Sequence, residues 1–287
     1  VSTGTSMPQR AGIPGENLIG VIHGINYLKK VKLGRDVPAA EHVVVIGGGN
    51  TAVDSARTAL RKGAKKVTIL YRRTQNMMPA YEAEIHEALK EGVEIIPLAQ
   101  PVKIIGDAEY RVTRVEYTKM KLGDFDSSGR RRSVPSDEPN QFIDADLVIP
   151  AISQYADLPF IPVEDIGRTQ WGTFTVDPDT MMTTMKGVFA GGDIVRGPDS
   201  VIQAIADGKK AAIAIDRFFG GRGALNRGEE IKLPRPQDDD DVVELPRYPL
   251  DMLELEKRKD SFDEVVLGYH KLTAMAESMR CLHCERR

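Results

Sequence analysis

Apolar runs and helical repeats alternate along the first part of the chain. The run at residues 42–46 is continuous and β-branched, which predicts a parallel strand buried on both faces, and residues 66–71 predict a second one. Between them, residues 51–62 carry helical spacing that ends at Gly63. These segments therefore predict one βαβ unit of a parallel sheet.

The same alternation continues on both sides of that unit. Residues 112–120 differ, because apolar and polar side chains alternate there as in an exposed antiparallel strand, and a polar turn follows at 126–129. The other patterned segments predict a helix over 20–33, a helix over 79–90, a strand over 93–97, a buried strand over 147–152, and a strand followed by a helix over 187–219. The whole pattern is that of an α/β fold.

Composition narrows the class of protein. The 287 residues are enough for two domains of about 150 residues each, and a net charge of −3 gives no positive field for holding nucleic acid. No apolar run reaches the roughly 18 residues that span a bilayer and no signal segment opens the chain, so we expect no membrane partner and a cytoplasmic location. The opening residues from Val1 onward look like the middle of a fold, which favours a fragment.

A glycine-rich turn joins the first strand of the βαβ unit to its helix. The pattern Gly47-x-Gly49-x-x-Ala52 is the dinucleotide-binding fingerprint in the context that it requires. The first glycine permits the tight turn, the second lets the main chain approach a pyrophosphate, and N–H groups at the helix start face the phosphates. A plain glycine loop is the alternative. The predicted pyrophosphate site consists of Gly47, Gly48, Gly49, Asn50, Thr51 and Ala52.

The end of the second strand distinguishes the two nicotinamide nucleotides. An acidic residue there would accept a hydrogen bond from the ribose 2′-hydroxyl of NAD(H), but this sequence has Arg72 and Arg73. Two guanidinium groups can bind a 2′-phosphate through charge-assisted hydrogen bonds, so the sequence predicts NADP(H). The alternative is a pair of solvated arginines in a surface turn.

Residues 187–193 and 200–208 carry a second signal that a nicotinamide site does not require. A strand ending in Gly191-Gly192-Asp193 would place a carboxylate where it accepts from a polyol hydroxyl, and the next helix would direct N–H groups at a partly negative ring. Both are features that a flavin needs. The alternative is a strand, loop and helix in which Asp193 is only a cap.

These stretches together resemble the glutamate synthase small-subunit family, whose relatives include flavoprotein subunits of electron-bifurcating enzymes and a domain of dihydropyrimidine dehydrogenase. The resemblance implies a Rossmann-like NAD(P)-binding domain nested in an FAD-binding domain. That FAD-binding domain is partial here, because the family's amino-terminal glycine turn and iron–sulfur cysteines are absent from this sequence. The stretches that carry the resemblance are residues 12–16, 46–54, 71–73, 78–80, 91–93 and 188–212.

The resemblance also implies roles for single residues. Asp193 would hold the ribityl chain of FAD, Gly192 would bind the same cofactor, and Ser200, Val201 and Ala204 would lie along the pyrimidine edge of the flavin. The family usually has a glycine where Ser153 stands, which puts the packing near the nicotinamide or flavin in question. The implied domains are a residual FAD-domain segment over 1–15, an NADP(H)-binding domain over 16–150, the C-terminal part of the FAD-binding domain over 151–222, and a linker and tail over 223–287.

The two cysteines of the chain form one Cys-x-x-Cys motif, at Cys281 and Cys284. Such a pair can be a redox dithiol, half of a metal site or two thiols without a role. In fused relatives a similar ending accompanies iron–sulfur electron transfer, which implies ligation of a metal or an iron–sulfur cluster with cysteines from a partner. His283 is an incidental neighbour or an added ligand.

The expected function is that of an NADPH-dependent flavoprotein oxidoreductase module. Hydride passes from NADPH to FAD, and electrons continue to iron–sulfur centres or a partner subunit, with no catalytic acid, base or nucleophile. The alternatives are a thioredoxin-reductase-like dithiol enzyme and a non-catalytic nucleotide-binding or assembly module. Tyr117 and Lys121 have the spacing of the short-chain dehydrogenase pair, but they fall on a predicted strand and we exclude that family.

Overall fold

The computed structural model describes residues 1–125, 131–158, 165–224, 246–259 and 261–279, and it divides the chain into two compact units, Val1–Leu225 and Asn226–Arg287. The first unit contains β1 (Met7–Pro8), α1 (Gly24–Lys32), β2 (His42–Ile46), α2 (Asn50–Arg61), β3 (Lys66–Tyr71), the 3-10 helix η1 (Gln75–Met77), α3 (Glu82–Glu91), β4 (Glu94–Pro97), β5 (Ala99–Gly106), β6 (Val112–Phe125), β7 (Arg131–Pro135), β8 (Gln141–Asp144), β9 (Leu147–Pro150), β10 (Gln154–Tyr155), α4 (Asp193–Arg196) and α5 (Val201–Phe218).

A parallel sheet with strand order β4-β3-β2-β9 is the centre of the first unit. The predicted strands at 42–46 and 66–71 have the bounds of β2 and β3, and the predicted antiparallel strand at 112 begins β6. Continuous apolar strands are typical of a sheet that is covered on both faces. The βαβ prediction is therefore confirmed.

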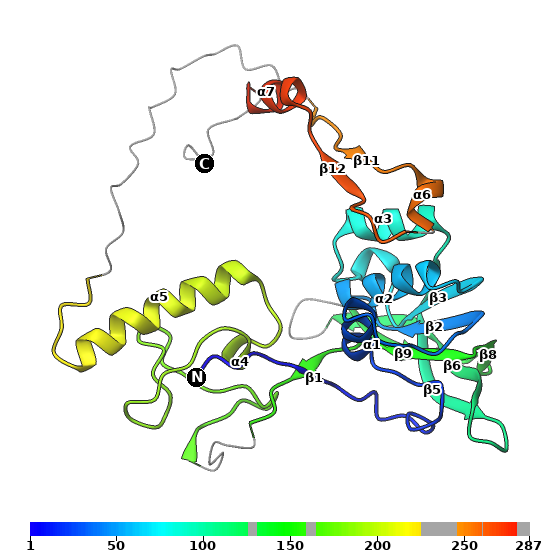
Figure 1. The fold of residues 1–287 in the computed structure, drawn as a ribbon. Coiled ribbons are helices and arrows are strands. Elements are labelled where there is room, and N and C mark those ends of the chain that lie inside the picture. The colour runs from blue at the N-terminus through cyan, green and yellow to red at the C-terminus, as the bar shows by residue number, and fades with distance from the viewer. Residues whose placement is uncertain (126–130, 159–164, 225–245, 260, 280–287) are drawn as a thin grey trace. The chain divides into compact units, whose positions relative to one another are not determined.

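The sheet is covered by helices on one face and by an antiparallel sheet on the other (Figure 1). Val43 and Val45 of β2 pack against Val53 and the other apolar residues of α2, whereas Val44 and Ile46 pack with the core of β5, β6 and β8. Successive residues of a strand point to opposite faces, so one short run of apolar residues supplies both cores. These three layers fix where the strands of the parallel sheet end.

Two predicted helices begin later than expected. The segment predicted to open a helix at residue 20 instead lies along β9, where the Ile22 N–H donates to the Val148 carbonyl at 3.0 Å, and α1 begins at Gly24. The helix predicted from Pro79 begins at Glu82. In both places tertiary hydrogen bonds hold the chain extended, and they outweigh the local helical spacing.

The prediction of a strand that ends at Asp193 is also wrong. Phe189 forms only an isolated bridge with Met182, and its carbonyl accepts from the amino group of Val1 at 2.5 Å. The helix that follows is present as α5, and a short helix, α4, starts at Asp193. Gly191 and Gly192 therefore lie in a turn rather than at the tip of a regular strand.

The antiparallel sheet has strand order β5-β6-β7, with β8 also paired to β6. Tyr117 and Lys121 lie on β6, as the exclusion of the short-chain dehydrogenase pair requires, and Lys121 forms an ion pair with Asp137 at 3.0 Å. The predicted polar turn at 126–129 lies outside the described residues.

The second unit is small and is built from β11 (Asp251–Met252), α6 (Leu255–Lys259), β12 (Val266–Gly268) and α7 (Lys271–Met279). No helix in the described ranges is both long and apolar enough to cross a membrane.

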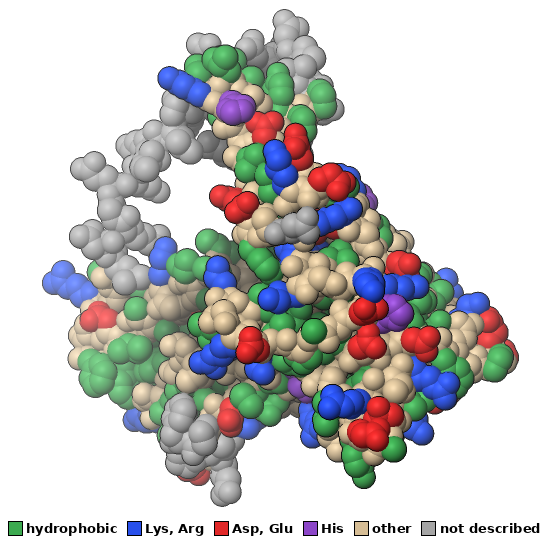
Figure 2. Space-filling model, turned by 45° about the vertical axis from the view of Figure 1, so that its right-hand side comes forward, with side chains coloured by type: hydrophobic (Ala, Val, Ile, Leu, Met, Phe, Trp, Pro, Cys, Tyr) green, Lys and Arg blue, Asp and Glu red, His purple; other side chains and the backbone are tan. Residues whose placement is uncertain are grey.

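On the face that Figure 2 shows, basic and acidic side chains are interspersed rather than gathered by sign.

Candidate nucleotide-binding site

The glycine turn at the end of β2 is closely packed at its first residue. Gly47 has a φ of +141°, and a Cβ there would lie 2.3 Å from the Ala151 carbonyl oxygen. Ala52 is fully buried in the core between α2 and the sheet. Both positions therefore require small residues for the reasons that the fingerprint implies.

The third glycine of the turn faces open space. A Cβ on Gly49 would meet no atom within 4 Å, and Gly49 is the N-cap of α2, where no side chain caps the helix. Asn50 does not cap it, because its Oδ1 accepts from the Tyr81 N–H at 3.0 Å. A helix start without a side-chain cap presents N–H groups to an anion, so the turn fits a pyrophosphate.

Arg72 and Arg73 follow β3 and line the same pocket as the glycine turn. The carbonyl of Arg72 accepts from the Ser133 hydroxyl, and the carbonyl of Arg73 accepts from the Leu98 N–H at 2.9 Å. The main chain that carries both guanidinium groups is thus held against β7 and against Leu98, the residue between β4 and β5. This places two cations on the same side as the helix start.

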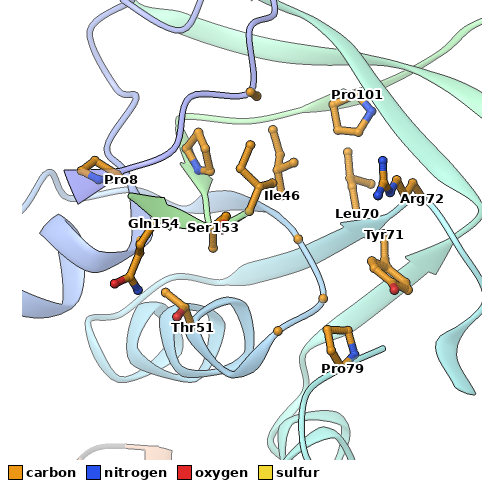
Figure 3. A pocket seen from close by; sticks show the side chains of 18 of the residues that line it. Pro8, Ile46, Thr51, Leu70, Tyr71, Arg72, Pro79, Pro101, Ser153 and Gln154 are labelled. Atoms are coloured by element: carbon orange, nitrogen blue, oxygen red, sulfur yellow. The ribbon is translucent and has the colours of Figure 1, made fainter. Parts of the chain in front are cut away.

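The pocket has a volume of about 580 Å³ and reaches from the arginines past the glycine turn to the loop after β9. In Figure 3, Arg72, Tyr71 and Pro79 lie at one end, Thr51 lies at the start of α2, and Ser153 and Gln154 lie at the other end. One continuous site therefore contains every predicted pyrophosphate residue except Asn50 and Ala52, together with both arginines.

The residues predicted for a flavin also lie together. Gly192, Asp193, Ser200, Val201 and Ala204 line one cavity of about 490 Å³. Ser200 is the N-cap of α5, and its hydroxyl accepts from the Gln203 N–H at 3.4 Å. Asp193 accepts from the Asp199 N–H at 3.3 Å. The local chemistry of a carboxylate beside a helix start fits the polar part of a flavin nucleotide.

A buried ion pair that sequence reasoning missed holds this turn on α5. Asp207 is fully buried, accepts from the Gly192 N–H at 3.0 Å and receives two hydrogen bonds from Arg196, at 2.6 and 2.7 Å. The hydrogen bonds from Arg196 lower the pKa of the Asp207 carboxyl. Gly191 allows the close approach, because a Cβ there would lie 2.9 Å from the Cβ of Asp207.

A second missed cluster joins α2 to α3. The Glu91 carboxylate, 2% exposed, accepts from Arg57 and Arg61 at 2.7 to 3.0 Å, and Arg57 also contacts Glu84. Burial raises the pKa of the Glu91 carboxyl, but the hydrogen bonds from both arginines outweigh it and bring the pKa down to about 2. The cluster fixes the helix that begins at the glycine turn.

The predicted metal ligands are not among the described residues. Cys281, Cys284 and His283 lie outside them, and the described part of the chain contains no group of three or more His, Cys, Asp or Glu side chains able to hold a metal ion. The role of the Cys-x-x-Cys motif therefore stays a prediction.

The two sites on one α/β scaffold define a two-dinucleotide-binding oxidoreductase fold. The chain belongs to the family described as pyridine nucleotide-disulphide oxidoreductase, whose sequence pattern matches residues 1–208. This assignment confirms the predicted fold class and the predicted class of enzyme.

Curated relatives agree with the predicted resemblance. The chain is 37% identical over all of its length to the NADP(+)-dependent formate dehydrogenase subunit beta of Moorella thermoacetica, of which it covers 42%. Over 92% of its length it is 34% identical to the NADPH-Fe(3+) oxidoreductase subunit beta of Geobacter sulfurreducens, covering 44% of that chain. It is 41% identical over 76% of its length to the glutamate synthase [NADPH] small chain of Azospirillum brasilense, covering 48%. The chain thus spans less than half the length of these relatives.

Solved structures show the same fold. FprA from Mycobacterium tuberculosis in complex with NADPH matches with a TM-score of 0.63 at 18% identity, over 76% of this chain and 63% of that one. The thioredoxin reductase of T. acidophilum matches with a TM-score of 0.57 at 25% identity, over 75% of this chain and 63% of that one. The arrangement of elements is therefore shared at low sequence identity.

Proposed function

We propose that this chain is the NADPH-binding module of a flavoprotein oxidoreductase. NADPH binds in the pocket at the glycine turn and donates hydride to FAD, and electrons continue to iron–sulfur centres or a partner subunit. The observation that carries the proposal is that an uncapped helix start and two arginines line one pocket. Together they match the pyrophosphate and the 2′-phosphate of a single nucleotide.

The residues of the chain bind and orient, while a bound FAD supplies the hydride acceptor. Gly47, Gly49 and the N–H groups at the start of α2 hold the pyrophosphate, and Arg72 and Arg73 hold the 2′-phosphate. The pocket continues past the turn to Ser153, which leaves room for the nicotinamide half. Gly192, Asp193, Ser200, Val201 and Ala204 would hold the flavin, since they line a common cavity.

The relatives support NADPH and a partner. The names of three of them contain NADPH or NADP(+), and each is named as a subunit or a chain of an enzyme. One name mentions formate, another Fe(3+) and the third glutamate. We therefore propose no electron acceptor more specific than a partner subunit or an iron–sulfur cluster. The dithiol alternative is disfavoured, because both cysteines of the sequence lie beyond residue 280, far along the chain from the nucleotide turn.

An anaerobic visible spectrum of the full-length protein tests this function. We expect flavin absorbance that bleaches on addition of NADPH and bleaches less readily with NADH. A full-length protein that binds NADPH but has no flavin absorbance would be a non-catalytic nucleotide-binding module and would contradict the proposal. Flavin that stays oxidised under excess NADPH would contradict it as well.

A further inference from the structure

The two arginines belong to a loop that returns to the glycine turn. Residues 72–81 connect β3 to α3, and at the far end of this loop the Ala80 N–H donates to the Gly48 carbonyl at 3.1 Å. The next residue, Tyr81, donates to Asn50 as described above. The loop is therefore anchored on the same turn that would bind the pyrophosphate.

Tyr71 connects the middle of this loop to the same place. Its side chain is buried, and a Cβ on Gly48 would lie 2.5 Å from two atoms of the Tyr71 ring, so the ring packs directly on the glycine backbone. Its hydroxyl donates to the Met77 carbonyl at 2.8 Å. One side chain thus contacts both the glycine turn and Met77, the last residue of η1.

The spacing of the two phosphate sites matters because the nucleotide fixes it. The pyrophosphate and the 2′-phosphate belong to one molecule, so the glycine turn and the arginines must be held at a matching separation. Charge-assisted hydrogen bonds from guanidinium groups depend on their geometry. A loop that is free to shift would lose contacts with the 2′-phosphate while the pyrophosphate stayed bound.

We propose that Tyr71 is a positioning residue for NADPH selectivity, in which the ring packs on Gly48 and the hydroxyl holds the arginine loop through Met77. This inference rests on the proposed NADPH site and deepens it. The Tyr71 ring packs on the backbone of the glycine turn, and its hydroxyl donates to Met77 in the loop that carries Arg72 and Arg73. The inference predicts that the hydroxyl contributes to the binding of NADP(H) and not to that of NAD(H).

The variant Tyr71→Phe separates the two functions of the side chain, because the ring stays and only the hydrogen bond to Met77 is lost. We expect the dissociation constant of NADP+ to rise about threefold to tenfold, as for one hydrogen bond, while that of NAD+ is unchanged. The readout is the ratio of the two constants, measured by calorimetric titration of the purified 287-residue chain. A purely structural role for Tyr71 would weaken both nucleotides alike.

Tyr117→Phe is the matched control. Tyr117 is also buried, and its hydroxyl donates to Gln141 Oε1 at 2.8 Å within the antiparallel sheet, away from the glycine turn. Each variant loses one tyrosine hydrogen bond and keeps its ring, so both are expected to fold. We expect Tyr117→Phe to lower the melting temperature about as much as Tyr71→Phe does. The ratio of the dissociation constants of NADP+ and NAD+ should stay at its wild-type value.

A double-mutant cycle with Arg72→Ala and Arg73→Ala separates this inference from the function beneath it. If the arginine variant keeps the wild-type selectivity, the NADPH assignment of the pocket is wrong. If the arginines matter but Tyr71→Phe changes neither nucleotide, or changes both equally, the positioning role is wrong. When Tyr71→Phe is added to the variant that lacks Arg72 and Arg73, the ratio of the NADP+ and NAD+ dissociation constants should not change further. A further change would also overturn the positioning role of Tyr71.

Discussion

At the scale of single residues, the three glycines of the turn are required for different reasons. Gly47 adopts a left-handed φ against a carbonyl, Gly48 makes room for the ring of Tyr71, and Gly49 leaves open space at the helix start. The fingerprint explains the first and the third. The structure supplies the reason for the second, which the sequence pattern leaves unspecified.

Alanine at Gly48 should therefore reduce mainly the stability of the chain, whereas alanine at Gly49 should reduce mainly the binding of nucleotides. In Gly48→Ala the new methyl group collides with the Tyr71 ring, and we expect a loss of about 1–3 kcal/mol in the free energy of unfolding, as for overpacking. In Gly49→Ala the methyl group meets nothing in the chain, so we expect a loss of stability below about 1 kcal/mol, because alanine is a poorer N-cap than glycine, and weakened binding of both NADP+ and NAD+.

Urea denaturation and calorimetric titration of the two variants measure these effects. A Gly49→Ala variant that binds both nucleotides as tightly as wild type would show that the pyrophosphate does not approach this residue. A Gly48→Ala variant of wild-type stability would show that the Tyr71 ring moves aside freely.

The glycine turn and the arginines were predictable from sequence because they are local patterns beside a strand and a helix. In the sequence, Tyr71 ends a predicted strand and begins a stretch that carries the family resemblance, and neither feature predicts a contact for its side chain. Its role depends on packing against Gly48, which lies 23 positions earlier in the numbering. No spacing rule reports a contact of that kind.

At the scale of elements, strands were predicted better than helix starts. The bounds of β2 and β3 follow from continuous apolar runs between polar residues and glycines. The start of α3 was missed because Pro79 is a common first helical residue. Here Ala80 and Tyr81 instead donate backbone hydrogen bonds to the glycine turn, which delays the helix.

The two buried ion pairs were missed for a related reason. Each carboxylate and its arginine partners belong to segments that meet only in the fold, as with Asp207 of α5 and Arg196 of α4. The sequence offered one signal, which was that Asp207 stands at a position of α5 that the helical pattern would turn inward. A charge at such a position needs a partner.

The Glu91 cluster between α2 and α3 gives a prediction about pH. Replacing Glu91 by Gln removes the negative charge from two partly buried guanidinium groups, and we expect a loss of about 3–5 kcal/mol in the free energy of unfolding at neutral pH. The folded-state pKa of about 2 lies below the ordinary value of 4.5, so the contribution is complete above pH 4.5 and is lost as pH falls toward 2.

Urea denaturation as a function of pH checks this prediction. The stability of the wild type and of Glu91→Gln should converge between pH 4.5 and pH 2. Glu138→Gln is the control, because Glu138 pairs with Lys119 at 2.9 Å but both side chains are about half exposed. Its cost should stay below about 1 kcal/mol. A constant gap between wild type and Glu91→Gln across this pH range would contradict the account.

At the scale of the whole molecule, the α/β class and the family were predictable because two dinucleotide signals occur in one chain. The partition at residues 15, 150 and 222 stays a prediction. The structure separates only Val1–Leu225 from Asn226–Arg287. The predicted strand before Asp193 failed because residues 187–190 have no regular strand partner among the described residues.

The Cys-x-x-Cys motif belongs to this scale, because it concerns the path of electrons beyond the flavin. We expect replacement of Cys281 and Cys284 by serine in the full-length protein to leave flavin reduction by NADPH unchanged and to lower the iron content and the onward transfer of electrons. Rapid-mixing absorbance and iron analysis measure both. Loss of flavin reduction at unchanged iron content would refute the assignment.

In the proposed function, Arg72 and Arg73 recognise the 2′-phosphate of NADPH. The most direct measurement compares the binding of 2′,5′-ADP and 5′-AMP to the purified chain, because these ligands differ only in that phosphate. We expect 2′,5′-ADP to bind at least about tenfold more tightly, as for one charge-assisted contact or more, and we expect Arg72→Ala with Arg73→Ala to abolish the difference. Equal affinities for the wild-type chain would contradict the proposal.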